Sequence, residues 1–250
     1  MKIIVTTGKK TRTTKLEDGH VYFTPTVLVF LAIGVGWMLF EIMVHHDANR
    51  AFSIQNMIFL AMTSSSIVLF LLLLVKGHAH LVNEGAFGGW GRVSMMTAGC
   101  TAAFVVINVI CGYLMEERGT YFIGTIEIYL FYAVSAPIAE ESLYRVFICT
   151  VIVILVMGVF NLAGGKKNNQ LKSLIANITA IAASGITFSL AHLGVYGDEP
   201  LMLLSTLLGG TVMATFYVYT KNPFVPLMAH LFNNVIAAGV IVTNAVMMIS

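Results

Sequence analysis

The sequence predicts an all-α fold, a polytopic membrane helical bundle with about eight transmembrane helices. Composition supports this class, because 58% of the 250 residues are hydrophobic and only 10% are charged, unlike the usage of soluble domains. The mean hydropathy is +0.86. The apolar residues also form continuous runs of roughly the 20 residues that a helix needs to cross a bilayer. A membrane β-barrel would instead need short segments of alternating apolar and polar residues.

Eight apolar runs are expected to cross the membrane as helices. No fixed-period repeat or low-complexity segment separates them, so we expect residues 23–250 to form a single integral membrane domain. The predicted spans are 23–44, 54–75, 93–115, 121–139, 146–162, 171–193, 201–220 and 224–248.

Residues 1–22 form a polar tail that we expect to be cytoplasmic. They lack the short apolar core of a cleavable signal peptide, so the first membrane helix is expected to act as the insertion signal. The tail is basic, and short basic segments tend to remain in the cytoplasm. Its basic residues are Lys2, Lys9, Lys10, Arg12 and Lys15. Eight crossings would place Lys166, Lys167, Lys172 and Lys221 on the opposite side, however, so the predicted charge asymmetry across the cell membrane is weak.

Charge and cysteine content exclude further classes of function. The formal net charge is only +2, with no block of like charge typical of a nucleic-acid-binding arm. We therefore expect membrane lipids and a substrate as partners, and no nucleic acid. The cysteines Cys100, Cys111 and Cys149 lie in predicted spans without the close spacing of a metal or redox pair, so we expect them to be packing residues.

The most informative stretch, 136–145, reads Ala-Pro-Ile-Ala-Glu-Glu-Ser-Leu-Tyr-Arg. Charged side chains inside a membrane are costly and usually face a protein-lined or wet cavity. Glu141 and Arg145 are four residues apart, the favourable order for an intrahelical ion pair. Glu140 would point about 100° away around a helix and present a less fully paired carboxylate, as a general base requires. Pro137 is expected to kink or restart the helix beside it.

Two further polar sites occur in later apolar runs. Phe188 and His192 are four residues apart and share one helical face, as do His230 and Asn234. Each site alone also fits ordinary packing, because polar side chains join membrane helices through hydrogen bonds. Together, however, the three sites contain a base, a second imidazole to orient a water molecule and donors for a developing oxyanion. These groups are the parts of acyl-transfer hydrolysis.

In this order, the three motifs resemble the CAAX protease and bacteriocin-processing family of glutamate-type intramembrane proteases. The resemblance covers residues 136–234 and includes the lead-in Ala-Pro-Ile. It implies an eight-helix bundle and an endopeptidase that needs no cofactor. The first glutamate and the histidine of the second motif would activate water, the third motif would form the oxyanion site, and the ion pair would hold the arrangement. The catalytic residues implied are Glu140, Glu141, Arg145, His192, His230 and Asn234.

Some features leave alternatives open. Tyr144 and Val146 stand where the family commonly has Phe and Gly, although neither departure removes a catalytic group. Glutamate and histidine are also zinc ligands, so a zinc-dependent membrane protease is an alternative, as is a non-catalytic scaffold, chaperone or immunity protein. The resemblance implies prenylated C-terminal peptides of lipidated proteins, or secreted peptides, as substrates, and the sequence does not choose between them.

The predicted helix boundaries also create a conflict in depth. Counted at about 1.5 Å per residue, Glu140 would lie roughly 27 Å along its helix, whereas His230 would lie only about 9 Å from the start of the last one. With eight crossings these two helices would enter the membrane from the same side. A shared site therefore requires a tilt, a break at Pro137 or a different helix boundary.

Overall fold

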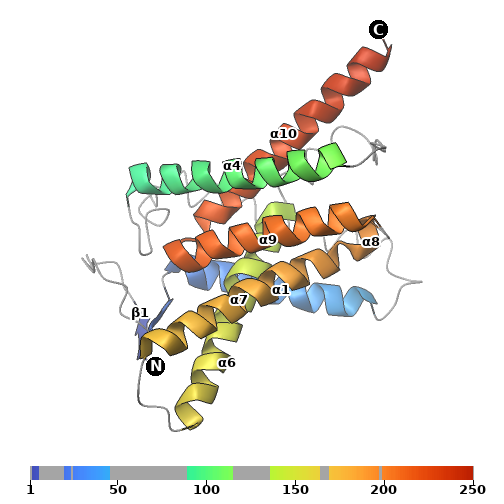
Figure 1. Ribbon diagram of the computed structural model, residues 1–250. Helices are drawn as coiled ribbons and strands as arrows, with labels where there is room; N and C mark the ends of the chain where they lie inside the picture. The colour runs from blue at the N-terminus through green and yellow to red at the C-terminus, as the bar shows by residue number, and fades with distance from the viewer. Residues whose placement is uncertain are drawn as a thin grey trace.

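The computed structural model describes residues 2–5, 20–23, 25–45, 89–114, 136–163, 169–196 and 199–249. Helices make up nearly all of this part of the chain (Figure 1). They are α1 (Pro25–His45), α4 (Trp90–Leu114), the π-helix η1 (Glu141–Ile148), α6 (Cys149–Leu162), α7 (Asn169–Ala191), α8 (Leu193–Tyr196), α9 (Pro200–Thr220) and α10 (Phe224–Ile249). Within the described residues, only the short parallel strands β1 (Lys2–Val5) and β2 (His20–Phe23) depart from the predicted all-α fold.

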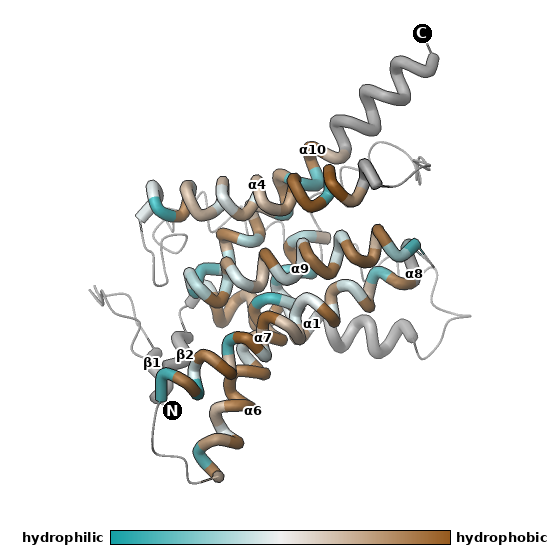
Figure 2. Tube along the Cα trace, viewed as in Figure 1, coloured by the Kyte–Doolittle hydropathy of each residue, from teal (hydrophilic) through white to brown (hydrophobic). Residues whose placement is uncertain are grey.

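Four of the described helical segments are long and apolar enough to cross a membrane. The hydropathy colouring in Figure 2 shows the apolar residues along these helices. The segments are Gly91–Cys111, Ala136–Leu162, Asn169–Ala191 and Pro200–Thr220. The predicted membrane helical bundle is thus supported, but the count of about eight spans is not confirmed. The predicted span 54–75 and most of the predicted span 121–139 lie outside the described residues.

One predicted boundary is wrong. The apolar runs predict one span that ends at residue 139 and another that begins at 146, with the charged motif in the connection between them. In the structure, Ala136–Leu162 is a single continuous helical span, and Glu140 has the backbone angles of a right-handed helix, φ −65° and ψ −45°. The charges interrupt the apolar run in the sequence, but they do not end the helix, because residues 141–146 are buried among other helices.

The helices α4 and α9 run antiparallel, and their contacts define the two ends of the bundle. Phe104 of α4 lies against Gly209, where an added Cβ would meet the phenyl ring. One turn further along α4, Asn108 accepts a hydrogen bond from Ser205 of α9. Because α9 must approach the Phe104 ring this closely, a side chain at position 209 would force the two helices apart.

The remaining helices align with the same two ends. Ser189 near the end of α7 donates to the carbonyl oxygen of Leu203 near the start of α9 at 2.9 Å, so α7 and α9 are also antiparallel. Phe30 of α1 packs edge to face on Phe224 at the start of α10, with ring centroids 5.7 Å apart. In Figure 1, α1, α4, α7 and α10 accordingly run in one general direction and α9 runs back.

This arrangement corrects the predicted distribution of basic residues. Arg92, Lys172 and Lys221 lie at the start of α4, the start of α7 and the end of α9, which share one end of the bundle with the start of α1. The prediction that Lys172 and Lys221 lie opposite the N-terminal tail is therefore wrong.

A buried core holds the helices together. The three cysteines are buried as predicted, and Cys149 lies 3.7 Å from the carbonyl oxygen of Ala180, which joins α6 to α7. Val146, where the family commonly has Gly, is fully buried. α1 also approaches η1 closely, because a Cβ on Gly34 would lie 2.5 Å from the carbonyl oxygen of Ser142.

Candidate active site

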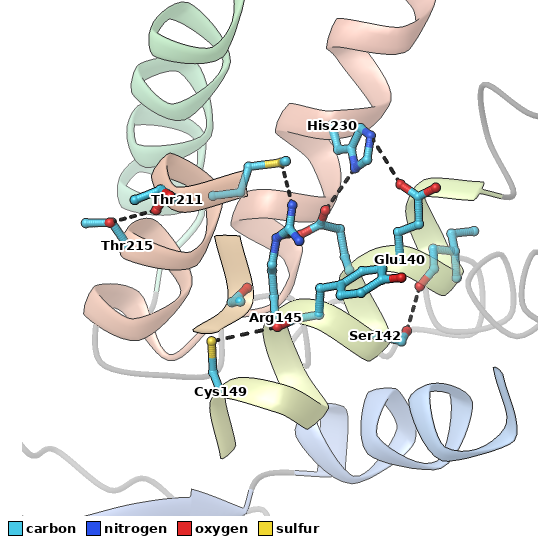
Figure 3. A network of polar contacts seen from close by, with 12 residues as sticks. Glu140, Ser142, Arg145, Cys149, Thr211, Thr215 and His230 are labelled. Atoms are coloured by element: carbon cyan, nitrogen blue, oxygen red, sulfur yellow. Dashed lines mark hydrogen bonds and ion pairs between the residues drawn. The ribbon is translucent and has the colours of Figure 1, made fainter. Parts of the chain in front are cut away.

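Two carboxylates and one imidazole meet where the helix Ala136–Leu162 approaches α10. Nδ1 of His230 lies 2.8 Å from Oε1 of Glu141, and Nε2 lies 3.7 Å from Oε2 of Glu140 (Figure 3). A carboxylate only accepts hydrogen bonds, so Nδ1 is the donor to Glu141. The Glu140 side chain is 21% exposed whereas that of Glu141 is fully buried. Glu140 is thus the less fully paired of the two carboxylates, as the sequence analysis predicts.

The local backbone explains how one helix presents both carboxylates to the same imidazole. The segment Glu141–Ile148 is π-helical, and π-helical segments inside α-helices occur frequently at functional sites. The spacing of the motif predicts an α-helix throughout and not this change. Residues 141–146 are buried, so the charges of the segment face protein and not lipid, which removes most of their cost in a membrane.

Arg145 is fully buried and closes the other side of the cluster. Its Nε lies 3.0 Å from Oε2 of Glu141, which confirms the predicted ion pair. The guanidinium carbon lies 4.1 Å from the centre of the Phe188 ring, within the range of a cation–π contact. Nη2 lies 3.8 Å from the sulfur of Met213. The ion pair lacks hydrogen-bond geometry, and within the described residues Nη1 has no hydrogen-bond partner.

His192 lies directly after the end of α7, and one aromatic ring contacts both His192 and His230. The Phe188 centroid is 4.6 Å from the His192 ring and 5.9 Å from the His230 ring. Nδ1 of His192 lies 2.8 Å from the carbonyl oxygen of Phe188. A carbonyl oxygen only accepts, so Nδ1 carries the proton and Nε2 keeps its lone pair in the neutral imidazole. Tyr196 stacks on the ring at 5.5 Å.

The positions of Glu140 and His192 along their helices correspond. Cys149 lies beside Ala180, and Tyr144 packs on Phe188 with centroids 5.4 Å apart, so the two helices pair with opposite directions. Continuing this pairing brings Glu140 toward the end of α7, where His192 lies. Within the described residues, no direct contact joins the two side chains.

Asn234 belongs to a polar network that the sequence analysis missed. Its Oδ1 lies 3.4 Å from Nδ2 of Asn233, and Oδ1 of Asn233 accepts from Nδ2 of Asn108 at 2.8 Å. Ser205 donates to Oδ1 of Asn108 at 2.6 Å. The available signal was a polar side chain inside an apolar run of α4 and another inside α9, but neither has a motif partner nearby in the sequence.

Glu140 and His230 meet in the structure in spite of the predicted conflict in depth. Glu140 is the fifth described residue of the helix Ala136–Leu162. His230 is the seventh residue of α10. The two side chains meet in the structure, with 3.7 Å between Nε2 of His230 and Oε2 of Glu140. The predicted boundary between residues 139 and 146 is wrong, and the helix is not broken at Glu140.

The same side chains do not form a ready set of metal ligands. Among the described residues, no group of three or more His, Cys, Asp or Glu side chains has an arrangement that could hold a metal ion. The zinc alternative would need His192 to join His230 and the two glutamates, whereas both imidazoles pack against the ring of Phe188. The present arrangement instead offers a partly exposed carboxylate, an imidazole with a free lone pair and several hydrogen-bond donors.

Comparison with known proteins relates the part of the chain that carries this site to a protein family. Residues 122–236 match the family model described as Type II CAAX prenyl endopeptidase Rce1-like. Comparisons with curated proteins and with solved structures give no match. The matched segment contains all three polar motifs and, together with the four apolar helices, identifies an integral membrane protein. Residues 122–236 thus form an Rce1-like domain of the CAAX protease and bacteriocin-processing family, as the motifs predict.

Proposed function

We propose that this protein is an intramembrane endopeptidase of the CAAX-processing type that hydrolyses a peptide bond with a water molecule activated by Glu140. The observation that carries the proposal is the division of labour between the two glutamates. Glu141 is buried and paired with both Arg145 and His230, at 3.0 and 2.8 Å. Glu140 is partly exposed and 3.7 Å from His230, which leaves its carboxylate available to take a proton.

The proposed reaction begins with attack of water on the peptide carbonyl carbon. Glu140 takes one proton of the water, while Nε2 of His192 accepts a hydrogen bond from it and orients it. The oxyanion that forms accepts a hydrogen bond from Asn234, and one from Nε2 of His230. Because Nδ1 of His230 already donates to Glu141, the second bond requires the imidazolium form. Glu140 then delivers the proton to the leaving amine as the C–N bond breaks.

We further propose that the N-terminus is cytoplasmic and that the catalytic residues lie toward the opposite membrane surface. The exposed or half-buried basic residues Arg92 and Lys221 lie at the same end of the bundle as the start of α1. Lys172 begins α7 at that end as well. Burial lowers the pKa of Lys221 to about 8, so it remains mostly protonated at neutral pH. Clustered Lys and Arg favour the cytoplasmic side.

This orientation bears on the choice of substrate. Glu140 and His192 lie toward the end of α7 and the start of α9, where the exposed Glu199 is found. If the basic end is cytoplasmic, a substrate reaches the site from the other side of the membrane. Of the two substrate classes that the family implies, this favours a peptide that has been translocated across the membrane over the C-terminus of a cytoplasmic lipidated protein.

The reaction is tested by peptide cleavage with the detergent-solubilised protein. Fluorogenic peptides with and without a farnesyl group are compared, each with and without a chelator. We expect cleavage that the chelator leaves unchanged, because the proposed base is a carboxylate. Loss of cleavage with the chelator would move the proposal to a zinc-dependent protease. Two results together would support the non-catalytic scaffold. The wild-type protein would cleave none of the peptides, and the Glu140→Gln variant would still replace the wild-type protein in cells.

The orientation is tested by cysteine labelling in intact cells. Glu199→Cys and Arg92→Cys each introduce one thiol at an exposed position, while the three native cysteines are buried. With a membrane-impermeant maleimide we expect Glu199→Cys to be labelled in intact cells and Arg92→Cys only after permeabilisation. The reverse pattern would place the N-terminus outside the cytoplasm.

A further inference from the structure

We infer that Asn108 is a positioning residue for Asn234 and acts through Asn233. The inference rests on the proposed function, in which Asn234 donates a hydrogen bond to the oxyanion. Asn108 lies in α4, outside the segment 122–236 that matches the family, and it is 125 residues from Asn233 in the sequence. The hydrogen-bond network of the site therefore includes a residue from a part of the chain that contains none of the three motifs.

The three amides form a chain of hydrogen bonds with one direction. Ser205 donates to Oδ1 of Asn108 at 2.6 Å. The amide nitrogen of Asn108 therefore faces away from Ser205 and donates to Oδ1 of Asn233 at 2.8 Å. The amide nitrogen of Asn233 in turn lies 3.4 Å from Oδ1 of Asn234. Each amide has its oxygen on one side and its nitrogen on the other, so every step fixes the orientation of the next group.

The end of this chain is the group that the reaction needs. Because Oδ1 of Asn234 accepts from Asn233, its amide nitrogen is directed away from Asn233 and remains a donor. An Asn234 side chain turned by 180° would present its oxygen instead, and an oxygen repels a developing oxyanion. The network therefore makes a specific contribution: it selects the catalytically useful orientation of the Asn234 amide.

The surroundings favour a network that keeps this order. Ser205 and Asn233 are 6% and 9% exposed, and Asn108 is half-buried. Buried amides lose much free energy when a donor or acceptor stays unpaired. The three partners also come from α4, α9 and α10, where the contact of Phe104 with Gly209 holds α4 close to α9.

The test combines Asn108→Leu with Asn234→Ala in a double-mutant cycle of kcat. Leucine has nearly the shape of asparagine and does not leave a new unpaired group at position 108. We expect Asn234→Ala to lower kcat about 100-fold, the cost of one oxyanion donor, and Asn108→Leu to lower it about 10-fold with KM unchanged. In the Asn234→Ala background, Asn108→Leu should cause no further loss, because non-additivity identifies residues that act through each other.

Asn161→Leu is the matched control, because Asn161 is exposed at the end of α6 and should keep the wild-type kcat. An unchanged kcat in Asn108→Leu, or an equal loss in both backgrounds, would overturn the inference and leave the proposed function intact. A wild-type rate in Asn234→Ala, or no peptide cleavage by the wild-type protein, would overturn the proposed function and the inference with it. Melting temperatures near wild type verify that each variant is folded.

Discussion

Glu140→Gln is expected to lower kcat by about 10²–10⁴-fold, the contribution that a general base makes to catalysis. Glutamine has the size of glutamate and keeps its hydrogen-bonding ability, but its amide does not take a proton from water. The Glu140 side chain is partly exposed and lies 3.7 Å from His230, so its charge contributes little to folding. We therefore expect a normal melting temperature and a nearly normal KM. Initial rates on the cleaved fluorogenic peptide provide the measurement.

The matched control is Glu199→Gln, which changes an exposed glutamate directly before α9. It removes the same charge at the same end of the bundle, and its kcat should equal that of the wild type. A Glu140→Gln protein with full activity would show that Glu140 is not the base. A loss of activity together with a fall in melting temperature would instead indicate that Glu140 supports the fold.

Most helix ends could be predicted from the sequence because they depend on local chemistry. The end of α9 at Thr220 and the start of α10 at Phe224 agree with the predicted spans, since Lys221, Asn222 and Pro223 interrupt two apolar runs. The same reasoning was wrong between residues 139 and 146. There the charges pair with each other and also contact His230, Phe188 and Met213 on other helices. Hydropathy along one segment contains no information about these partners.

In the candidate site, too, the contact within one helix could be predicted from the sequence and the contacts between helices could not. The pair of Glu141 and Arg145 follows from a spacing of four residues within one helix, so the sequence predicts it directly. The contact of Glu141 with His230 joins residues 89 positions apart, and the sequence analysis had assigned His230 to the oxyanion site alone. Asn108 was missed altogether, because an asparagine in an apolar run becomes recognisable only when the partner helices are in place.

Glu141→Gln is expected to destabilise the protein by about 3–5 kcal/mol, the cost of removing one partner from a buried ion pair. Glu141 and Arg145 are both fully buried, and within the described residues no other acidic side chain forms an ion pair with the guanidinium. The variant would leave a positive charge in the core, held by the face of Phe188 and the sulfur of Met213. Melting in detergent, followed by far-UV circular dichroism, measures the effect.

The double variant Glu141→Gln with Arg145→Met separates charge from packing. Removing both charges eliminates the uncompensated ion, because methionine fills the place of Arg145 with an apolar side chain of similar length. We therefore expect the double variant to melt at a higher temperature than Glu141→Gln alone. A double variant no more stable than the single one would mean that the Glu141 contact with His230, and not the pair with Arg145, holds this part of the bundle. Both variants should cleave peptides slowly, since Glu141 also orients His230.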